Sequence, residues 1–204
     1  MGASHSSADK LQLYYDPCSA NSLRVIMYMI EAGLPFELIK LDLNKGEHQR
    51  EEFVKVNPRM QVPFLVQGTV RMNESIGIID YLGRIYPNEH LFPTKDREGC
   101  ALNCRLIAEF HQKLDPLSLW STVVWRNKTR SQIGEDRIQN LFKELQIWED
   151  YLAQENDYFL GNHISTSDII VFPFIAVHFG YLVCLRNASP SLPPGKKECE
   201  SVHL

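Results

Sequence analysis

The sequence predicts a small α/β domain followed by an all-helical domain. Short β-prone runs alternate with helical segments up to residue 87, and beyond residue 97 no convincing strand pattern occurs. Residues 87–96 contain two prolines and several charged residues, which is typical of a domain boundary. The chain has 204 residues, of which 44% are apolar, so it can form a real core in one large domain or two small ones.

The first elements have the pattern of a βαβ unit. Residues 11–15 alternate apolar and polar side chains, and Asp16-Pro17 ends this predicted strand. Apolar residues at helical spacing follow until Gly33, and residues 36–41 form a second β-prone run. Because a helix provides the crossover, we expect these two strands to be parallel.

The next elements complete a mixed sheet. Residues 44–56 are mostly polar and predict a short exposed helix at most. The β-prone runs 62–66 and 70–72 flank a glycine-containing turn, which predicts an antiparallel hairpin. Residues 75–86 predict a helix that Pro87 ends. This order of elements is that of a thioredoxin-like domain with a mixed four-stranded sheet.

The second half is predicted as three helices, over residues 100–125, 133–153 and 166–185. Pro116 is expected to kink or divide the first of them. Ser165 and Asp168 have the spacing of a capping box, in which the hydroxyl meets the third helical amide while the carboxylate reaches back. The last helix has little polar surface, so we expect it in the middle of the helical domain.

These elements divide the chain into a disordered leader (1–10), a thioredoxin-like domain (11–87), a linker (88–97), an all-helical domain (98–188) and an irregular tail (189–204). The tail is polar, short and without periodicity. The opening residues match the N-myristoylation pattern at Gly2, with an unmodified polar leader as the alternative. No stretch is apolar and long enough to span a bilayer, so we expect no membrane partner.

Charge and cysteine content exclude some classes of function. The formal net charge of -4 comes from intermixed signs, so the sequence lacks the basic stripe that nucleic acid requires and a small-molecule partner is expected. The five cysteines show no CxxC pair and no metal-ligand spacing, which favours a reducing, cytoplasmic compartment and predicts no metal site.

One turn has the residues for sulfur chemistry. Ser19 lies between a predicted strand end and a predicted helix start, where its hydroxyl and the helix amides could stabilise a bound thiolate. Lowering the pKa of a thiol from about 8.5 by two units requires about 2.7 kcal/mol, which one charged hydrogen bond and a helix end could supply. Cys18 offers a second chemistry, since its own thiol at a helix N-terminus could attack a disulfide. A structural role of both residues, as turn residues or N-caps, is the third alternative.

Two further segments favour peptide binding. A proline at position 63 starts a predicted strand, and with a cis bond the backbone groups of Val62 would turn outward to pair with an extended peptide. Asn73-Glu74-Ser75 leads from the hairpin into a helix, where a hydroxyl and unpaired amides would bind a carboxylate. Viewed alone, Asn73 or Ser75 is more simply an N-cap.

Taken together, the Ser19 turn, the run Asn57 to Pro63, the run Asn73 to Ser75 and the Ser165/Asp168 box resemble cytosolic glutathione transferases in order and spacing. The resemblance covers about residues 11–188 and is to the serine-type theta, delta and rho classes, closest to rho. It implies a thioredoxin-like domain that binds glutathione and a helical domain that binds a small hydrophobic electrophile. It also implies a homodimer, and glutathione as a co-substrate with no other cofactor.

The resemblance implies a role for each matching position. Ser19 matches the serine that activates the glutathione sulfur, and Cys18 lies where a glycine is usual. Six more positions match glutathione contacts: His48, Gln61, Val62, Pro63, Glu74 and Ser75. The first two match contacts at the glycyl end, the next two match the backbone partner of the cysteinyl unit and the cis proline, and the last two hold the γ-glutamyl amino and carboxylate groups.

The expected activity is conjugation of glutathione to hydrophobic electrophiles, a detoxification reaction. Cys18 leaves a glutathione-dependent thiol reductase as an alternative. The chain after residue 192 departs from the family's usual last helix, so a catalytically impaired glutathione-binding protein is another. On the first long helical segment, Phe110, Leu114 and Trp120 either line the pocket for the electrophile or belong to the helical core.

Overall fold

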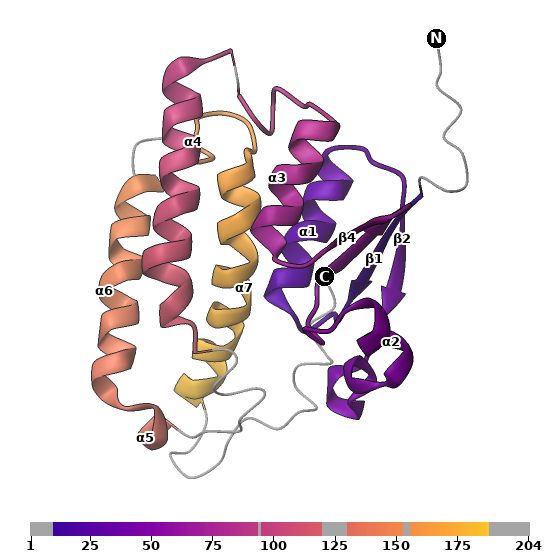
Figure 1. The fold of residues 1–204 in the computed structure, drawn as a ribbon. Coiled ribbons are helices and arrows are strands. Elements are labelled where there is room, and N and C mark those ends of the chain that lie inside the picture. Colours follow the sequence, from indigo (N-terminus) through magenta and orange to yellow (C-terminus); the bar gives the residue numbers. More distant parts are fainter. Residues whose placement is uncertain (1–9, 94, 120–129, 153–155, 188–204) are drawn as a thin grey trace. The chain divides into compact units, whose positions relative to one another are not determined.

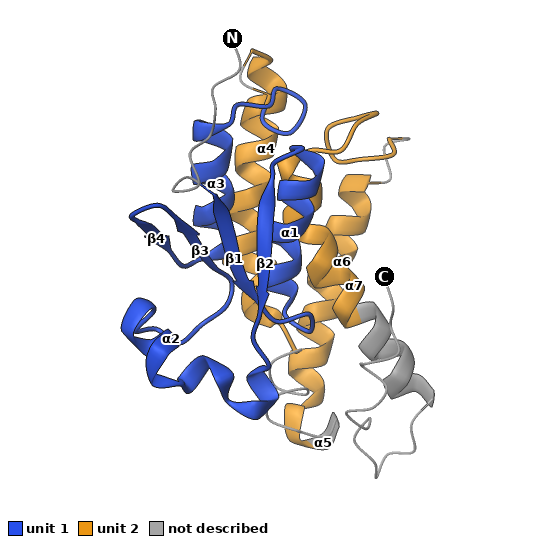
Figure 2. Cartoon of the chain, turned by 90° about the vertical axis from the view of Figure 1, so that its right-hand side faces the viewer, with its two compact units in different colours: residues 1–92 blue, residues 93–204 orange. Residues whose placement is uncertain are grey.

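The computed structural model describes residues 10–93, 95–119, 130–152 and 156–187. The chain separates into unit 1, Met1–Phe92, and unit 2, Pro93–Leu204 (Figure 2). The division falls inside the segment 88–97 that the sequence predicts as a linker. The predictions for Gly2, most of the leader, Trp120 and the tail lie outside the described residues.

Unit 1 contains the predicted mixed sheet. Its strands are β1 (Leu11–Tyr15), β2 (Phe36–Lys40), β3 (Phe64–Gln67) and β4 (Val70–Met72), in the spatial order β2-β1-β3-β4. β1 is parallel to β2 and antiparallel to β3, and β3 is antiparallel to β4. The predicted βαβ unit and hairpin are therefore both confirmed.

Two helices cover one face of this sheet. α1 (Ala20–Glu31) and α3 (Ser75–Ile85) lie side by side against it (Figure 1). The apolar side chains that fill this layer have at most 2% of their surface exposed: Leu11, Leu13, Leu65, Val25, Tyr28, Met29, Ile78, Ile79 and Leu82. Each contributes roughly 1.5 to 3 kcal/mol by leaving water, so this core fixes the strand ends and helix starts on which the site depends.

The polar segment after β2 is packed more firmly than the sequence predicts. It forms two turns of 3-10 helix and then α2 (Glu51–Val56). The expectation of an exposed helix is wrong for Phe53, which is 4% exposed and whose ring centroid lies 5.3 Å from that of Tyr14 and 5.8 Å from that of Phe64. Successive strand residues face opposite sides, so Tyr14 and Phe64 offer α2 an aromatic surface on the face away from Leu13.

Unit 2 is helical in its described part, as predicted. It contains α4 (Arg97–Glu109), α5 (Arg130–Ile133), α6 (Glu135–Leu152) and α7 (Thr166–Asn187). α4 begins three residues earlier than predicted because the Asp96 carboxylate accepts a hydrogen bond from the Glu98 amide at 3.1 Å. After Glu109 the chain continues as a π-helical turn and then a 3-10 turn that contains Pro116, so the regular α-helix ends before this proline. Residues 120–125 of the predicted helix lie outside the described residues.

The predicted helix 133–153 is divided at Gly134, whose φ of +88° lies in the left-handed region that glycine tolerates.

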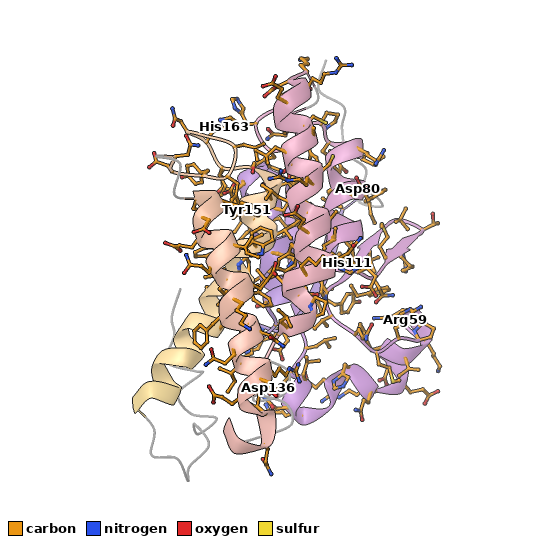
Figure 3. All side chains as sticks on the ribbon, turned by 90° about the vertical axis from the view of Figure 1, so that its left-hand side faces the viewer. Arg59, Asp80, His111, Asp136, Tyr151 and His163 are labelled. Carbon is orange, nitrogen blue, oxygen red and sulfur yellow. The ribbon has the colours of Figure 1, made fainter. Side chains whose placement is uncertain are left out.

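The remaining helices of unit 2 pack through aromatic rings. The Phe110 ring makes edge contacts with Trp148 of α6 and Phe174 of α7, at centroid distances of 6.4 and 5.6 Å. Tyr151 of α6 points toward α4 (Figure 3), where its hydroxyl donates to Glu109 at 2.9 Å.

The predicted capping box at the start of α7 is present in its carboxylate half. Asp168 accepts hydrogen bonds at 2.9 Å from the backbone amides of Ser165 and Phe159. The Ser165 hydroxyl donates to the same carboxylate at 2.5 Å. Asp168 therefore holds both the helix start and the preceding loop, and α7 supplies the buried residues Ile169, Ile170 and Phe174 to the core of unit 2.

We expect Gly83→Ala on α3 to destabilise the protein, although alanine is the better helix former. The new Cβ would lie 2.5 Å from Cε2 and 2.7 Å from Cδ2 of Phe92, whose ring packs edge-on against Tyr28. Overpacking of this kind costs about 1 to 3 kcal/mol, against about 1 kcal/mol gained in helix propensity.

Gly77→Ala on the same helix is the matched control, because its Cβ would meet only the Glu74 Cβ at 3.8 Å. Urea denaturation should show a stability loss for Gly83→Ala and none for Gly77→Ala. Adding Phe92→Leu should recover most of the loss, and equal stabilisation by both alanines would contradict the contact.

Candidate functional site

Four connecting segments meet at one end of the sheet of unit 1 (Figure 2). β1 and β2 pair in parallel along their whole lengths, so both end at the same edge. β3 begins there at Phe64, opposite Tyr14, and β4 ends there at Met72. These segments contain every residue that the sequence predicts to contact the ligand in this domain: Cys18, Ser19, His48, Gln61, Val62, Pro63, Glu74 and Ser75.

Ser19 is the N-cap of α1. Its backbone is extended, with φ -93° and ψ 109°, and its hydroxyl oxygen accepts a hydrogen bond from the Ser22 amide at 3.2 Å. The side chain is half-buried. A hydroxyl has one proton and two lone pairs, so the cap uses a lone pair and leaves the O–H as a donor. The structural and the chemical role of Ser19 are therefore compatible.

Asp16 holds the Ser19 turn in place, a role that sequence reasoning missed. Its side chain is 3% exposed. One carboxylate oxygen accepts from the Cys18 amide at 2.7 Å, and the other accepts from the Leu43 amide at 3.0 Å. The carboxylate thus joins the segment after β1 to the segment after β2. In the sequence the Asp-Pro pair indicated only that the strand ends.

Asp16→Asn should cost about 2 kcal/mol of unfolding free energy. The asparagine keeps one acceptor, but its NH2 group would face a backbone N–H and leave that buried donor without a partner. Asp80→Asn is the control, because Asp80 is exposed and pairs with Arg84 on the surface of α3. Chemical denaturation should show a clearly larger loss for Asp16→Asn, and equal losses would contradict the role of Asp16.

Cys18 is present as a half-buried thiol directly before Ser19. The Cys18 backbone amide donates the hydrogen bond that the Asp16 carboxylate accepts, so this carboxylate also fixes the backbone at Cys18. The structure thus places both candidate sulfur-handling residues at the N-terminal end of α1.

The segment before β3 is held by Asn57, which is fully buried. Its side-chain amide donates to the Gln61 carbonyl at 2.8 Å, and its carbonyl oxygen accepts from the Arg59 amide at 3.3 Å. Met60 has a positive φ of 53°, which is uncommon for a residue with a side chain. The peptide bond between Val62 and Pro63 is cis, as the sequence reasoning anticipated. Val62 lies before the β-ladder.

The segment after β4 ends in an unusual helix start. Glu74 has φ 66° and is exposed, while Ser75 is the first residue of α3 and is 6% exposed. The alternative of an Asn73 or Ser75 N-cap is wrong, because Glu74 occupies the N-cap position and makes no side-chain cap hydrogen bond in this described segment. The first-turn amides of α3 are thus left without a side-chain acceptor, the arrangement that favours a bound carboxylate.

His48 lies in the 3-10 turn Glu47–Gln49 that follows β2. Its Nδ1 is buried and has no hydrogen-bond partner among the described residues, while its Nε2 lies 3.3 Å from Nε2 of Gln49. The structure places His48 at the same end of the sheet as Ser19.

The candidates for a second pocket belong to unit 2. Phe110 and Leu114 are fully buried in unit 2, and Phe110 packs against Trp148 and Phe174. Their burial supports the helical-core alternative that the sequence left open, and Trp120 lies outside the described residues. Among the residues that the structure describes, no three side chains of His, Cys, Asp or Glu could jointly hold a metal ion, and no helix could cross a membrane.

Comparison with known proteins agrees with this arrangement. Residues 13–90 match the family described as glutathione S-transferase, N-terminal domain. Glutathione S-transferase theta-1 of Bos taurus is 30% identical over 199 residues, which cover 94% of this chain and 82% of the relative. Glutathione S-transferase 3 of Zea mays is 32% identical over 190 residues, covering 90% and 81%.

A solved structure gives the same result for the fold. A glutathione S-transferase from the Antarctic clam Laternula elliptica superposes with a TM-score of 0.73 at 24% identity. The superposition covers 84% of this chain and 79% of the clam protein. A thioredoxin-like sheet followed by helices is therefore an architecture that this chain shares with a transferase of known structure.

Proposed function

This chain belongs to the glutathione S-transferase family, and from this premise we propose that it conjugates the thiolate of reduced glutathione to hydrophobic electrophiles. The predicted resemblance is confirmed at the level of the family, and the closer likeness to the rho class stays a prediction. The observation that carries the proposal is the geometry of Ser19, which caps α1 with a lone pair and keeps its proton for a bound sulfur.

The proposed chemistry is stabilisation of a thiolate. The Ser19 hydroxyl donates to the glutathione sulfur, and the N-terminal end of α1 adds a favourable electrostatic field. Together they lower the pKa of the bound thiol from about 8.5 by about two units, so that most of it is ionised at neutral pH. The thiolate attacks the electrophilic carbon, and the leaving group departs with its electron pair. Positioning and charge stabilisation account for the catalysis.

The other segments at this end of the sheet hold the rest of the tripeptide. The uncapped start of α3, with Ser75, binds the γ-glutamyl carboxylate, and the exposed Glu74 carboxylate binds the amino group. The Val62 backbone, with Pro63 after it, pairs with the cysteinyl unit as a strand would. His48 and Gln61 contact the glycyl end. Glutathione is a co-substrate in this proposal, and no further cofactor takes part.

The remaining features of the proposal do not come from the geometry of the site. The electrophile is a small hydrophobic molecule bound by the helical domain. The protein acts as a homodimer in the cytoplasm, where its five cysteines stay reduced. The proposed biological role is detoxification.

The proposed function is tested with the complete chain, glutathione and a chlorinated nitroaromatic electrophile. We expect turnover to the thioether, retention on immobilised glutathione, and a bound thiol that titrates about two units below 8.5 by thiolate absorbance. Retention without turnover on several electrophiles would refute the conjugation step. Absence of retention would refute the glutathione site as a whole.

A further inference from the structure

A buried cation lies behind the proposed γ-glutamyl pocket. Arg24 is on α1, the helix that packs beside α3 on the sheet, and only 2% of its surface is exposed. Arginine is almost never fully buried unless its charge is used, because its guanidinium stays ionised in any protein environment. No motif in the sequence indicates a role for this residue.

Arg24 contacts the residue that heads α3. Its Nη1 lies 3.3 Å from the Ser75 hydroxyl oxygen, and both side chains are buried. A guanidinium has donors only, so Ser75 must accept this hydrogen bond with one of its lone pairs. The proton of the Ser75 hydroxyl is thereby kept for another acceptor. Arg24 therefore fixes the hydroxyl as a hydrogen-bond donor.

The geometry around Ser75 suits a carboxylate as that acceptor. Ser75 is the first residue of an 11-residue helix whose N-cap residue, Glu74, makes no side-chain cap within the described segment. A carboxylate at this position would meet the first-turn amides of α3 and the Ser75 hydroxyl at once. The positive charge of Arg24, one hydrogen bond behind the hydroxyl, would add to the favourable potential there.

On the basis of the proposed function, we propose that Arg24 is a positioning residue for the γ-glutamyl carboxylate of glutathione. It acts through Ser75 and does not touch the ligand. It selects ligands that carry the carboxylate, because it polarises the hydroxyl toward an anion and offers nothing to a ligand without one. If Arg24 only stabilised the fold, its replacement would weaken the binding of both kinds of ligand equally.

The test compares glutathione with 4-aminobutyryl-cysteinyl-glycine, which lacks only the γ-glutamyl carboxylate. Dissociation constants are measured by calorimetry for the wild type, Arg24→Met, Ser75→Ala and the double variant. We expect Arg24→Met to raise the dissociation constant of glutathione about tenfold and that of the analogue less than twofold. In the Ser75→Ala background the same substitution should change glutathione binding by less than threefold, because the residue through which it acts is gone.

Two further variants separate position from fold. Arg24→Gln is neutral and can accept the Ser75 proton, so it should lose the selectivity, and it serves where Arg24→Met does not fold. Arg24→Lys keeps a charged donor and should retain selectivity within about threefold of the wild type. Arg84→Met removes an exposed cation of the same unit that pairs with Asp80. This variant should change the affinity for neither ligand.

Equal weakening of both ligands by Arg24→Met or Arg24→Gln would overturn the proposal, as would effects of Arg24 and Ser75 that simply multiply. The failure of the proposed function gives a different result, namely a wild type that binds neither peptide. The two outcomes are therefore distinguishable in one set of titrations.

Discussion

Replacing Ser19 by alanine is expected to lower kcat/KM for glutathione conjugation by about ten- to a hundredfold. A hydrogen bond to a charged group contributes about 1.5 to 3 kcal/mol, and the alanine removes it from the thiolate. The pKa of bound glutathione should rise by about one to two units. At saturating glutathione, the pH profile of kcat/KM for the electrophile should shift upward by the same amount, so the loss is smaller at high pH, where the thiol ionises without help.

The alanine also removes the N-cap of α1, so the catalytic and structural effects must be separated. Ser19→Thr keeps both the cap and the hydroxyl and should retain most of the activity. Ser19→Asp keeps the cap, since aspartate accepts from the Ser22 amide as well as serine does, but its charge repels the thiolate. Ser19→Asp should therefore be stable and inactive.

Cys18→Ala is the control for the neighbouring thiol. If Ser19 is the sulfur-stabilising residue, Cys18→Ala should conjugate at close to the wild-type rate. Loss of conjugation in Cys18→Ala together with undiminished turnover in Ser19→Ala would assign the chemistry to Cys18 and refute the role of Ser19.

Local sequence signals were sufficient for most of unit 1. The alternation in β1, the helix stop at Gly33 and the hairpin around Gly68 each depend on neighbouring residues only, and all appear in the structure. Local signals misled at the start of α3, where Glu74 and not Asn73 or Ser75 is the N-cap, and in the segment containing Phe53, where polar composition predicted exposure. Its burial depends on two aromatic residues from β1 and β3, which no local window contains.

The site shows the same division between local and distant signals. Ser19 was found because a serine between a strand and a helix is itself a signal. Asp16 and Arg24 were missed because their partners, Leu43 and Ser75, lie 27 and 51 residues away. Such pairs become visible only when the fold brings β2 beside β1 and α3 beside α1. The residues that support this site are thus identified by tertiary contacts, whereas the residue proposed to act on the sulfur is identified by its local sequence.

His178 on α7 has a buried polar environment of the same tertiary origin. Its Nε2 lies 3.0 Å from the Leu119 amide, which can only donate, and its Nδ1 lies 2.6 Å from the Phe174 carbonyl, which can only accept. These two bonds require a neutral ring with its proton on Nδ1. The ring also stacks on Phe174 at a centroid distance of 4.0 Å. Burial lowers the pKa of His178 to about 4, although the bond to Phe174 acts in the opposite direction.

The stability of the protein should therefore fall by about 3 kcal/mol through His178 alone as the pH drops from 6.5 to 4. The unfolded chain binds a proton at this histidine with a pKa near 6.5, whereas the folded chain does so only near 4, so acid favours unfolding across that window. Above pH 6.5 the contribution is complete and constant. His178→Gln, which can keep both hydrogen bonds without titrating, should remove this part of the slope. His111→Gln, at an exposed histidine (Figure 3), should leave the slope unchanged.

Unfolding free energies measured by urea titration at half-unit pH intervals would test this prediction, because the carboxylates contribute equally to all three proteins and cancel in the differences. A wild type and a His178→Gln variant with parallel profiles between pH 6.5 and 4 would show that the ring is protonated in the folded state, against the hydrogen bonds that surround it.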